Sequence, residues 1–296
     1  MKEKPFSKYH ISINVVMMLW TIIIVLPFLL LFLSSITDET ALVANGYSFF
    51  PKKFSLASYS YIIKSGGVIL RAYGVSIVVT LVGTLLNVLL SALMAYPLSI
   101  KNLPGRKFMM FFVFFTMLFN GGIVPSYIMW TGTFHVKDTI FAQLLPNFLL
   151  SAWNVMMIRT YFTSSIPDGL YEAAEIDGAS QFTIFWKIVL PLGKPILVTM
   201  GTFAGLAYWN DWTNGLYYIV KRTALFNVQN LLNQMVQNIQ YIAQSSDANV
   251  GSAAANIPAT GIQMAIAFVA ILPIMLIFPS FQKYYAKGIA LGAVKG

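Results

Sequence analysis

The chain has 296 residues, of which 57% are hydrophobic and only 10% are charged. Soluble domains carry roughly 25% charged residues, so this composition excludes a soluble globular protein. Cysteine is absent, which excludes disulfides, thiol catalysis and zinc–thiolate sites. The net charge of +9 would suit nucleic-acid binding in a soluble chain. In a membrane protein we attribute it to basic residues that hold loops in the cytoplasm.

The N-terminus combines a basic segment, residues 1–10, with an almost unbroken apolar run at 11–33. A signal peptide has the same order of charge, but its apolar core is only about 7–15 residues long. The longer run here predicts an uncleaved first transmembrane helix, with Pro27 as a candidate kink.

Five further apolar runs follow a polar external loop that is predicted over residues 34–70. Each run reaches the roughly 20 residues that a helix needs to cross a bilayer. We therefore expect an all-α integral membrane protein with six transmembrane helices. The five later spans cover approximately 73–99, 108–131, 140–163, 192–219 and 262–282.

The basic residues predict the orientation of these spans. Placing both termini in the cytoplasm puts twelve of the 19 lysines and arginines inside and seven outside, as the positive-inside rule favours. The segments are then a cytoplasmic N-terminus (1–10), the first span, the external loop, a five-helix core (71–283) and a cytoplasmic tail (284–296). The inner residues are Lys2, Lys4, Lys8, Lys101, Arg106, Lys107, Arg159, Lys187, Lys194, Lys283, Lys287 and Lys295; the outer ones are Lys52, Lys53, Lys64, Arg71, Lys137, Lys221 and Arg222.

Three spans contain residues that interrupt a helix or are polar: Asn120–Gly122 with Pro125, Pro146 with Asn147, and Trp209–Trp212. Irregular backbone at membrane depth is tolerated where protein or a water-filled cavity satisfies it. We attribute Gly121 and Pro146 to packing. Asp211 is a candidate for a polar path, because a carboxylate within a span is costly to bury. A position at the membrane interface would lower that cost and remains the alternative.

A second long external loop, 221–261, separates the last two spans. Apolar residues at 225, 228, 231, 232, 235 and 239 predict an amphipathic helix over Ala224–Ile242. Such a helix either lies on the membrane surface or projects towards a protein that delivers substrate.

The polar stretch at 165–190, between the fourth and fifth spans, predicts two short cytoplasmic helices. Ser165 as the capping side chain, with Pro167 and Asp168, indicates a helix start. Gly178 favours the left-handed turn that ends the helix after Asp177. Paired small residues would let this first helix sit close against another protein. Composition alone favours an ordinary amphipathic loop helix.

Ser180 is expected to cap the second helix of this stretch. Phe182, Phe185 and Val189 would share one face of that helix, and Pro191 would open a new segment.

The spacing of this stretch resembles the EAA motif of permease subunits of bacterial ABC importers. The resemblance implies a MetI-like permease fold in which these coupling helices dock into a cleft on a separate ATPase. Glu172, Ala173, Ala174, Asp177, Gly178, Ile188, Leu190 and Pro191 would then carry the ATPase contact.

Three softer matches resemble the carbohydrate-uptake branch of these permeases, in particular its polygalacturonate, aldouronate and alginate-type members. They are Phe119–Pro125, Trp209–Trp212 and the C-terminal stretch 283–296. The resemblance implies a bacterial cytoplasmic membrane location, a second homologous permease, two ATPases that bind ATP and Mg, an extracytoplasmic binding protein and an oligosaccharide substrate. It implies no cofactor or metal in this chain and no nucleic-acid partner.

Candidates for the translocation path combine aromatic faces, which stack on sugar rings, with amides and one carboxylate. Trp and Tyr also gather at membrane interfaces without any ligand. The candidates are Asn120, Tyr208, Trp209, Asn210, Asp211, Trp212 and Asn214.

Two other classes of membrane protein fit the sequence less well. An intramembrane enzyme needs paired polar catalytic groups, yet the only histidines, His10 and His135, fall on opposite sides of the predicted membrane. An ion-coupled secondary transporter often shows an inverted repeat and buried ionisable sites, and we find no such repeat. The sequence has no G-x-x-x-x-G-K-[ST] loop, so energy from ATP must come from a partner. For the cargo, the resemblance and seven external basic residues favour an acidic, uronate-containing oligosaccharide over a neutral one. The alternative is that Lys52, Lys53, Lys221 and Arg222 merely hold lipid phosphates at the outer interface.

Overall fold

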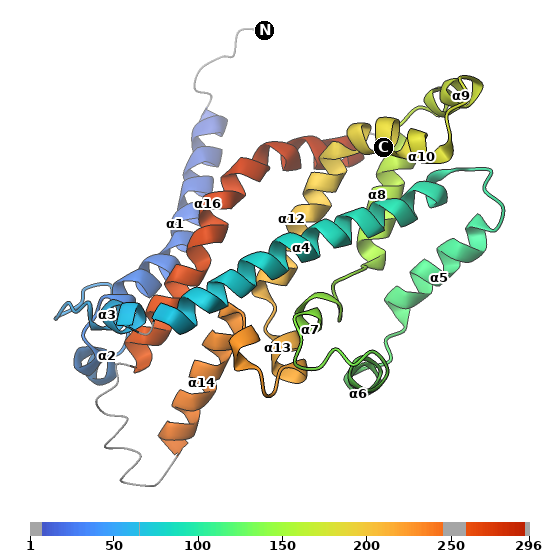
Figure 1. Cartoon of the computed structure of the whole chain (residues 1–296). Coiled ribbons are helices and arrows are strands. Elements are labelled where there is room, and N and C mark those ends of the chain that lie inside the picture. Colours follow the sequence, from blue (N-terminus) through green and yellow to red (C-terminus); the bar gives the residue numbers. More distant parts are fainter. Residues whose placement is uncertain (1–7, 65, 245–258, 294–296) are drawn as a thin grey trace. The chain divides into compact units, whose positions relative to one another are not determined.

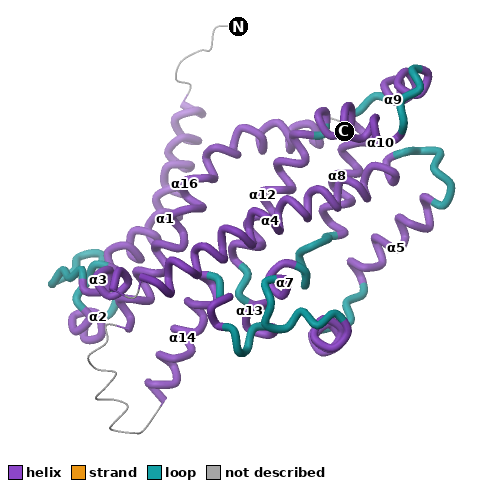
Figure 2. Tube along the Cα trace, in the orientation of Figure 1, coloured by secondary structure: helices purple, strands orange, loops and turns teal. Residues whose placement is uncertain are grey.

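Helices form nearly all the regular structure of the computed structural model, which describes residues 8–64, 66–244 and 259–293. Figure 2 shows these helices joined by loops, with no strand among the residues described. Thr37 and Phe54 form an isolated antiparallel bridge. A helix pairs its own backbone N–H and C=O groups, as an apolar segment in lipid requires. The predicted all-α class is confirmed.

The elements follow the chain in the order labelled in Figure 1. Their bounds are α1 Lys8–Ser35, α2 Glu39–Asn45, α3 Ala57–Lys64, α4 Gly66–Ser99, α5 Arg106–Leu118, α6 Ile123–Ile128, η1 Met129–Thr133, α7 Phe141–Leu144, α8 Ala152–Ser165, α9 Asp168–Ile176, α10 Gln181–Ile184, η2 Phe185–Val189, α11 Leu190–Leu192, α12 Lys194–Asn210, α13 Thr213–Tyr218, η3 Thr223–Leu225, α14 Val228–Gln244 and α16 Ala259–Ala293.

Two helices among the described residues are long and apolar enough to cross a bilayer, Ile11–Ser35 and Gly67–Ser99. The number rises to four if each of two bent helix pairs forms a single span. Arg106–Leu118 meets Ile123–Thr133 at 111°, and Gln181–Leu192 meets Lys194–Asn210 at 78°. The predicted interruption at Asn120–Gly122 therefore coincides with a sharp bend.

Several element boundaries differ from the prediction. The 34–70 loop contains α2 and α3, and α4 already begins at Gly66. The fourth predicted span, 140–163, is not one helix, because the chain is irregular from 145 to 151 and Asn147 has a φ of +68°. The helix predicted at 224–242 is α14, while residues 245–258 of that loop lie outside the described residues. Finally, α16 continues through most of the predicted tail.

The chain divides into two compact units. The first comprises Met1–Ile69 and Leu232–Pro273. In it Glu39, the first residue of α2, accepts hydrogen bonds from the backbone N–H groups of Thr260 (2.9 Å) and Gly261 (2.8 Å) at the start of α16. A carboxylate at this position compensates the positive end of the helix dipole. Glu39 therefore fixes α16 to the loop that follows α1.

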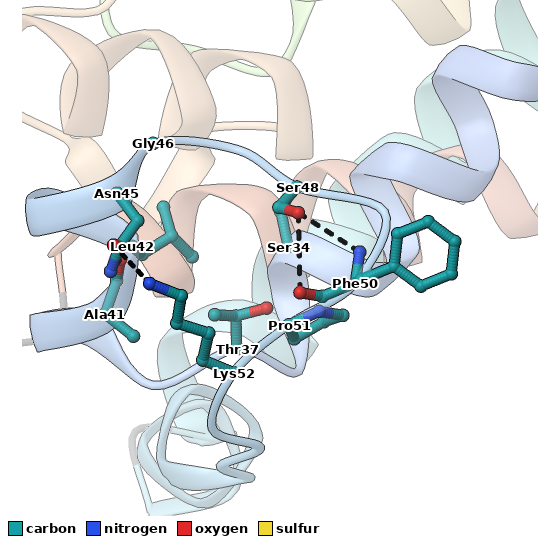
Figure 3. Close-up of a pocket in the computed structure, with 10 residues that line it drawn as sticks. All are labelled: Ser34, Thr37, Ala41, Leu42, Asn45, Gly46, Ser48, Phe50, Pro51 and Lys52. Carbon is teal, nitrogen blue, oxygen red and sulfur yellow. Dashed lines mark hydrogen bonds between the residues drawn. The ribbon is translucent and has the colours of Figure 1, made fainter.

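The first unit also contains a pocket of about 250 Å³, formed where α1 ends and the 46–52 loop folds back over α2 (Figure 3). Lys52 Nζ donates to Asn45 Oδ1 at 3.2 Å on one side of it. On the other side of the pocket, the Ser48 hydroxyl donates to the Phe50 carbonyl and accepts the Phe50 backbone N–H. The Ser34 hydroxyl, which lines this pocket, is buried without a hydrogen-bond partner.

The second unit comprises Leu70–Leu231 and Ile274–Gly296. Its main apolar cluster joins the C-terminal half of α4 to α8, α10, η2 and α12. The largest fully buried members are Leu98, Ile158, Phe162, Ile184, Phe185 and Val189. Because residues on both sides of the 165–191 stretch contribute to this cluster, the stretch is attached to packed protein at each end.

Candidate functional site

The EAA segment, residues 165–191, begins with α9, which lies at the tip of the connection between α8 and α10 (Figure 1). Its N-cap is Pro167, without a side-chain cap, so the predicted capping role of Ser165 is wrong; Ser165 ends α8 instead. Asp168 occupies the first turn of α9 as expected, and its Oδ2 pairs with Lys101 Nζ at 2.5 Å. That ion pair connects α9 to the loop after α4.

The end of α9 confirms the predicted left-handed turn. Gly178 has a φ of +75°. Its N–H bonds the Glu175 carbonyl at 3.0 Å, and the next residue, Ala179, bonds the Ala174 carbonyl at 2.9 Å. These two bonds form a Schellman motif, which satisfies carbonyls that the helix end leaves unpaired. Glycine is the residue that adopts this backbone without strain.

The second helix begins as predicted, because the Ser180 hydroxyl accepts the Thr183 N–H at 3.2 Å. It then widens into a π-turn over Phe185–Val189, just before Pro191, which has no N–H to continue an α-helical ladder. The predicted shared face holds for Phe185 and Val189, both buried, but Phe182 is exposed and does not join them.

Gln181 connects the two helices of the EAA segment to α4. Its amide nitrogen donates to Glu175 Oε1 at 2.9 Å, while its amide oxygen accepts the Tyr96 hydroxyl. Burial raises the pKa of the neighbouring Tyr171 phenol above its ordinary value. Sequence reasoning missed Gln181, because nothing local marks an exposed glutamine as a bridge.

The motif residues divide by exposure. Glu172, Ala173, Asp177 and Pro191 are exposed, and Ile188 and Leu190 are half-buried. Ala174 is buried in the main apolar cluster, so of the alanine pair only Ala173 is free to approach another protein. Large apolar side chains nevertheless face outward nearby, above all Ile176 (86% exposed), with Leu170 and Phe182.

The second candidate region is the break between α12 and α13. Asp211 is 5% exposed, and its Oδ1 accepts the Thr213 N–H (3.0 Å), the Thr213 hydroxyl (2.7 Å) and the Asn214 N–H (3.3 Å). Its Oδ2 is buried and has no hydrogen-bond partner within the described ranges of the chain. One carboxylate oxygen thus organises the first turn of α13, and the other remains available.

Buried amides surround this break. Asn214 donates to the Pro146 carbonyl and accepts from Asn147, which fixes the irregular stretch before α8. Asn227 donates to the Asp211 carbonyl at 2.7 Å, and Asn230 donates to the Trp212 carbonyl. Sequence reasoning missed Gln143, Asn87, Asn154, Asn227 and Asn230, whose partners lie tens of residues away in the chain.

The predicted path residues occupy different environments. Tyr208 is fully buried, where its hydroxyl donates to the Leu144 carbonyl at 2.9 Å. Trp209 is also buried, whereas Asn210 and Trp212 are exposed. Asn120 lies apart from them, exposed, and accepts the Gly122 N–H at 2.8 Å in the bend between α5 and α6. Their part in a translocation path stays a prediction.

Comparison with known proteins shows which of them share this arrangement of helices. The Bacillus subtilis protein LplC is 36% identical over 274 residues, covering 93% of this chain and 90% of LplC. The polygalacturonan/rhamnogalacturonan transport system permease protein YtcP of the same organism is 36% identical over 280 residues, covering 95% and 96%. A crystal structure of a bacterial ABC transporter involved in the import of the acidic polysaccharide alginate contains a chain with the same fold, with a TM-score of 0.79, 24% identity and coverage of 95% and 100%.

Residues 78–291 match the family of binding-protein-dependent transport system inner membrane components. The matched region contains both the EAA segment and the α12–α13 break. Together with the helical fold, the match makes the chain a non-catalytic transport subunit, as the sequence predicted. The chain belongs to the family of inner membrane components of binding-protein-dependent transport systems, with the MetI-like permease fold.

Proposed function

We propose that this chain forms half of the translocation pathway of an ATP-driven oligosaccharide importer and receives movement from an ATPase through the EAA segment. Two ATPase subunits that bind ATP and Mg, a second homologous permease and an extracytoplasmic binding protein complete the assembly. The observation that carries this proposal is the geometry of α9. It presents Glu172, Leu170 and Ile176 outward, while its start is tied to the loop after α4 and its end to packed helices.

The contacts of the EAA segment supply a route for force. The Lys101–Asp168 pair holds the start of α9 to the loop after α4, and Gln181 links Glu175 to Tyr96 within α4. Buried residues of η2 extend the connection to α8 and α12. Packed interiors transmit displacement because they resist compression. A push on α9 is therefore expected to reach α4 and α12 together.

Gly178 offers the sharpest test of coupling. A Cβ at this position would meet no atom within 4 Å, so the Gly178→Val variant stresses only the backbone, which has positive φ. A non-glycine residue in this region costs about 1–2 kcal/mol. In reconstituted complexes we expect reduced ATP hydrolysis in response to loaded binding protein, with normal membrane insertion.

The matched control for this test is Gly74→Val in α4, outside the EAA segment, where φ is not positive and no described atom lies within 4 Å of an added Cβ. Complexes that contain this variant should hydrolyse ATP as wild-type complexes do. Full stimulated hydrolysis by the Gly178→Val complex would contradict the coupling role. Failure of any ATPase to co-purify with the wild-type chain would favour the ion-coupled alternative.

For the cargo we propose an acidic oligosaccharide that contains uronate units. YtcP is named for polygalacturonan and rhamnogalacturonan, and the structural relative for alginate import. The predicted external side also carries more basic than acidic residues, a field that raises the encounter rate of an anion and weakens with salt. Basic residues that only hold lipid phosphates would give the same count.

Oligosaccharides of matched length distinguish an acidic cargo from a neutral one. The complete complex with its binding protein should respond to uronate oligomers with faster ATP hydrolysis than to neutral oligomers of equal length. Stimulation by the neutral series alone would overturn the acidic preference and leave the importer role intact.

We further propose that both termini and the EAA segment lie in the cytoplasm. The chain contains no cysteine, so single cysteines introduced at Lys4, Lys107 and Lys52 report topology directly. A membrane-impermeant maleimide applied to intact cells should label the Lys52→Cys variant alone. Labelling of Lys107→Cys from outside would reverse the orientation.

The α14 helix is proposed to meet the binding protein. Its start is anchored, because Ser76 accepts the Val228 N–H at 2.9 Å and Asn227 and Asn230 are buried. Exposed polar residues follow at Gln234, Gln237 and Asn238. Replacing these three with alanine should weaken stimulation by the binding protein and leave the bound ATPase in place. Unchanged stimulation would identify α14 as a surface helix only.

A further inference from the structure

Two arginines converge on one backbone oxygen at the end of α4. Arg106 Nε donates to the Leu98 carbonyl at 3.0 Å, and Arg159 Nε donates to the same oxygen at 3.2 Å. Leu98 lies among the last four residues of α4, whose carbonyls have no partner within the helix. Because both nitrogens bond one oxygen, the two guanidinium groups are close neighbours, although they come from α5 and α8.

This pair carries an unbalanced charge. Neither guanidinium forms an ion pair with any carboxylate in the described part of the chain, where the ion pairs are Lys53–Asp38 and Lys101–Asp168. Each guanidinium has five N–H donors. Arg159 uses one of them in the bond to Leu98, and Arg106 uses a second, at 3.4 Å, on the Lys101 carbonyl. Most of the donors of these two adjacent cations therefore have no acceptor among the residues that the structure describes.

Capping of α4 alone does not account for two arginines. A helix C-terminus carries roughly half an elementary negative charge, which one cation already balances. Both side chains are half-buried, so the repulsion between them is screened less than on an open surface. An anion with several oxygens would balance the charge and occupy the free donors. Guanidinium groups match phosphate geometry with paired hydrogen bonds.

The surroundings point to the source of that phosphate. Arg106 is the first residue of α5, and large apolar side chains follow it within two turns: Phe108 (66% exposed), Phe111 and Phe112. Their rings lie against each other, with centroids 4.7 Å apart for Phe108 and Phe112. These phenylalanines lie on the face of α5 opposite Arg106, Met110 and Val113, of which Met110 and Val113 pack in the main apolar cluster. What points to a lipid is the level of the arginines. Leu98 is the penultimate residue of Gly67–Ser99, a helix long and apolar enough to cross a bilayer, so the pair lies where such a helix meets the headgroups.

We propose that Arg106 and Arg159 form a binding site for the phosphate of an anionic phospholipid. The chemistry recognised is a phosphate, which a lipid headgroup or free inorganic phosphate could supply. The lipid is favoured because the arginines lie at the end of a helix long and apolar enough to cross a bilayer, the level at which headgroups gather.

The test uses native mass spectrometry of the complete transporter complex, purified in mild detergent and titrated with phosphatidylglycerol. The Arg106→Gln/Arg159→Gln variant should bind at least one tightly held lipid fewer per copy of this chain, with apparent affinity reduced about tenfold or more, the scale of a lost charge-assisted hydrogen bond. The matched control, Lys107→Gln/Lys194→Gln, removes two exposed charges and should retain the lipid.

A second arm replaces phosphatidylglycerol with inorganic phosphate, and a third with phosphatidylcholine. Arginine-dependent stabilisation of the complex by phosphate, with equal phosphatidylglycerol binding in wild type and variant, would assign the site to a free anion and overturn the lipid proposal. So would equal lipid retention in the two double variants, or arginine-dependent retention of phosphatidylcholine as strong as that of phosphatidylglycerol.

Assembly of the variant complex is checked by co-purification of its ATPase. If the double glutamine variant does not assemble, Arg159→Lys carries the test, because lysine keeps the charge and loses the planar fork. Reduced phosphatidylglycerol affinity in Arg159→Lys supports the site, and wild-type affinity there contradicts it.

Discussion

The EAA segment and the α12–α13 break both concentrate polar residues between apolar helices, yet the structure uses them in opposite ways. The EAA segment exposes Glu172 and Asp177, and its hydrogen bonds are mostly local caps. The α12–α13 break buries Asp211 and Asn214 and satisfies them with partners from distant parts of the chain. The same residue types thus form a proposed docking surface in one region and, in the other, a buried network of hydrogen bonds, the amide brace.

This difference predicts where substitutions affect folding and where they affect only partners. Changes at the break should reduce the stability of the chain itself. Changes at the exposed side of the EAA segment should leave stability unaltered and act on assembly. The effects below run from the largest expected to the smallest.

The largest effect is expected at Gly215 in α13. A Cβ at this position would lie 1.9 Å from Oδ1 of Asn230, which is itself held by Gln143 and the Trp212 carbonyl. Asn230 cannot move without breaking these buried bonds, so Gly215→Ala should destabilise the chain by about 1–3 kcal/mol or more through overpacking. Thermal unfolding of the purified complex measures the loss.

The matched control for Gly215 is Gly74→Ala in α4, where no atom lies within 4 Å of an added Cβ. Alanine is the better helix former by about 1 kcal/mol, so this variant should melt at or above the wild-type temperature. A wild-type melting temperature for Gly215→Ala would show that the amide brace is looser than the structure indicates.

The brace also shows which features sequence analysis can find. Gly178, Ser180 and Asp168 were predicted because helix caps depend on residues a few positions apart. The bends at Asn120–Gly122 and Pro146 were also visible, since their residues disfavour a continuous helix. The pairs Asn87–Asn154 and Asn214–Pro146 carry no local signal, because they join segments 67 and 68 residues apart. Short α2 and α3 were missed because neither shows a long apolar period.

Variants of Asp211 distinguish a structural role of this carboxylate from a role in the proposed translocation path. Asp211→Ala removes an oxygen that accepts three hydrogen bonds in a buried site, which should cost about 1–3 kcal/mol of stability. Asp211→Asn keeps an acceptor at Oδ1 and should lose less. Thermal unfolding and substrate transport are measured for both variants.

For Asp211→Asn, retained transport and lost transport lead to different conclusions. Near-normal stability with lost transport would show that the negative charge, carried also by the unpartnered Oδ2, serves the path. Near-normal stability with normal transport would make Asp211 a brace alone. Severe unfolding of Asp211→Asn would contradict the assignment of the Oδ1 bonds as its main structural contribution.

Ile176 tests whether the exposed face of α9 contributes to ATPase binding without contributing to the stability of the chain. The side chain is 86% exposed, so Ile176→Ala should change chain stability by no more than about 0.5 kcal/mol. If α9 enters a cleft on the ATPase, the same change should weaken ATPase binding by about tenfold, as expected for a buried interface anchor. Co-purification at graded detergent and salt gives the readout.

A matched control for Ile176 is Ile63→Ala, which shortens another highly exposed isoleucine, on α3 in the first unit. It should affect neither stability nor ATPase retention. Equal ATPase retention by wild type and Ile176→Ala would remove α9 from the docking surface, whatever the effect of Gly178→Val.

The smallest effect concerns Asp138, a half-buried counterpart of Asp211 that also organises the backbone around it. Desolvation acts to raise its pKa, but backbone N–H groups of Lys221, Arg222 and Val220 outweigh it, so the pKa of Asp138 lies below its ordinary value. Two of these bonds measure 2.8 Å and the third 3.2 Å. A carboxylate with a depressed folded-state pKa contributes stability above the unfolded value, about 3.9, and loses it as pH falls through the folded pKa.

Hydrogen exchange over residues 219–223, corrected for intrinsic rates, should therefore show protection at pH 6 that declines below about pH 4. Asp138→Asn should be less protected at pH 6, and the two proteins should converge in acid, because the protonated carboxyl resembles the amide. A wild-type advantage that persists at the lowest pH would show that shape, and not the carboxylate charge, holds the loop. In that case Asp138 would join the buried amides of the break as a geometric brace, and the contrast between exposed charge and buried packing would no longer separate the two regions.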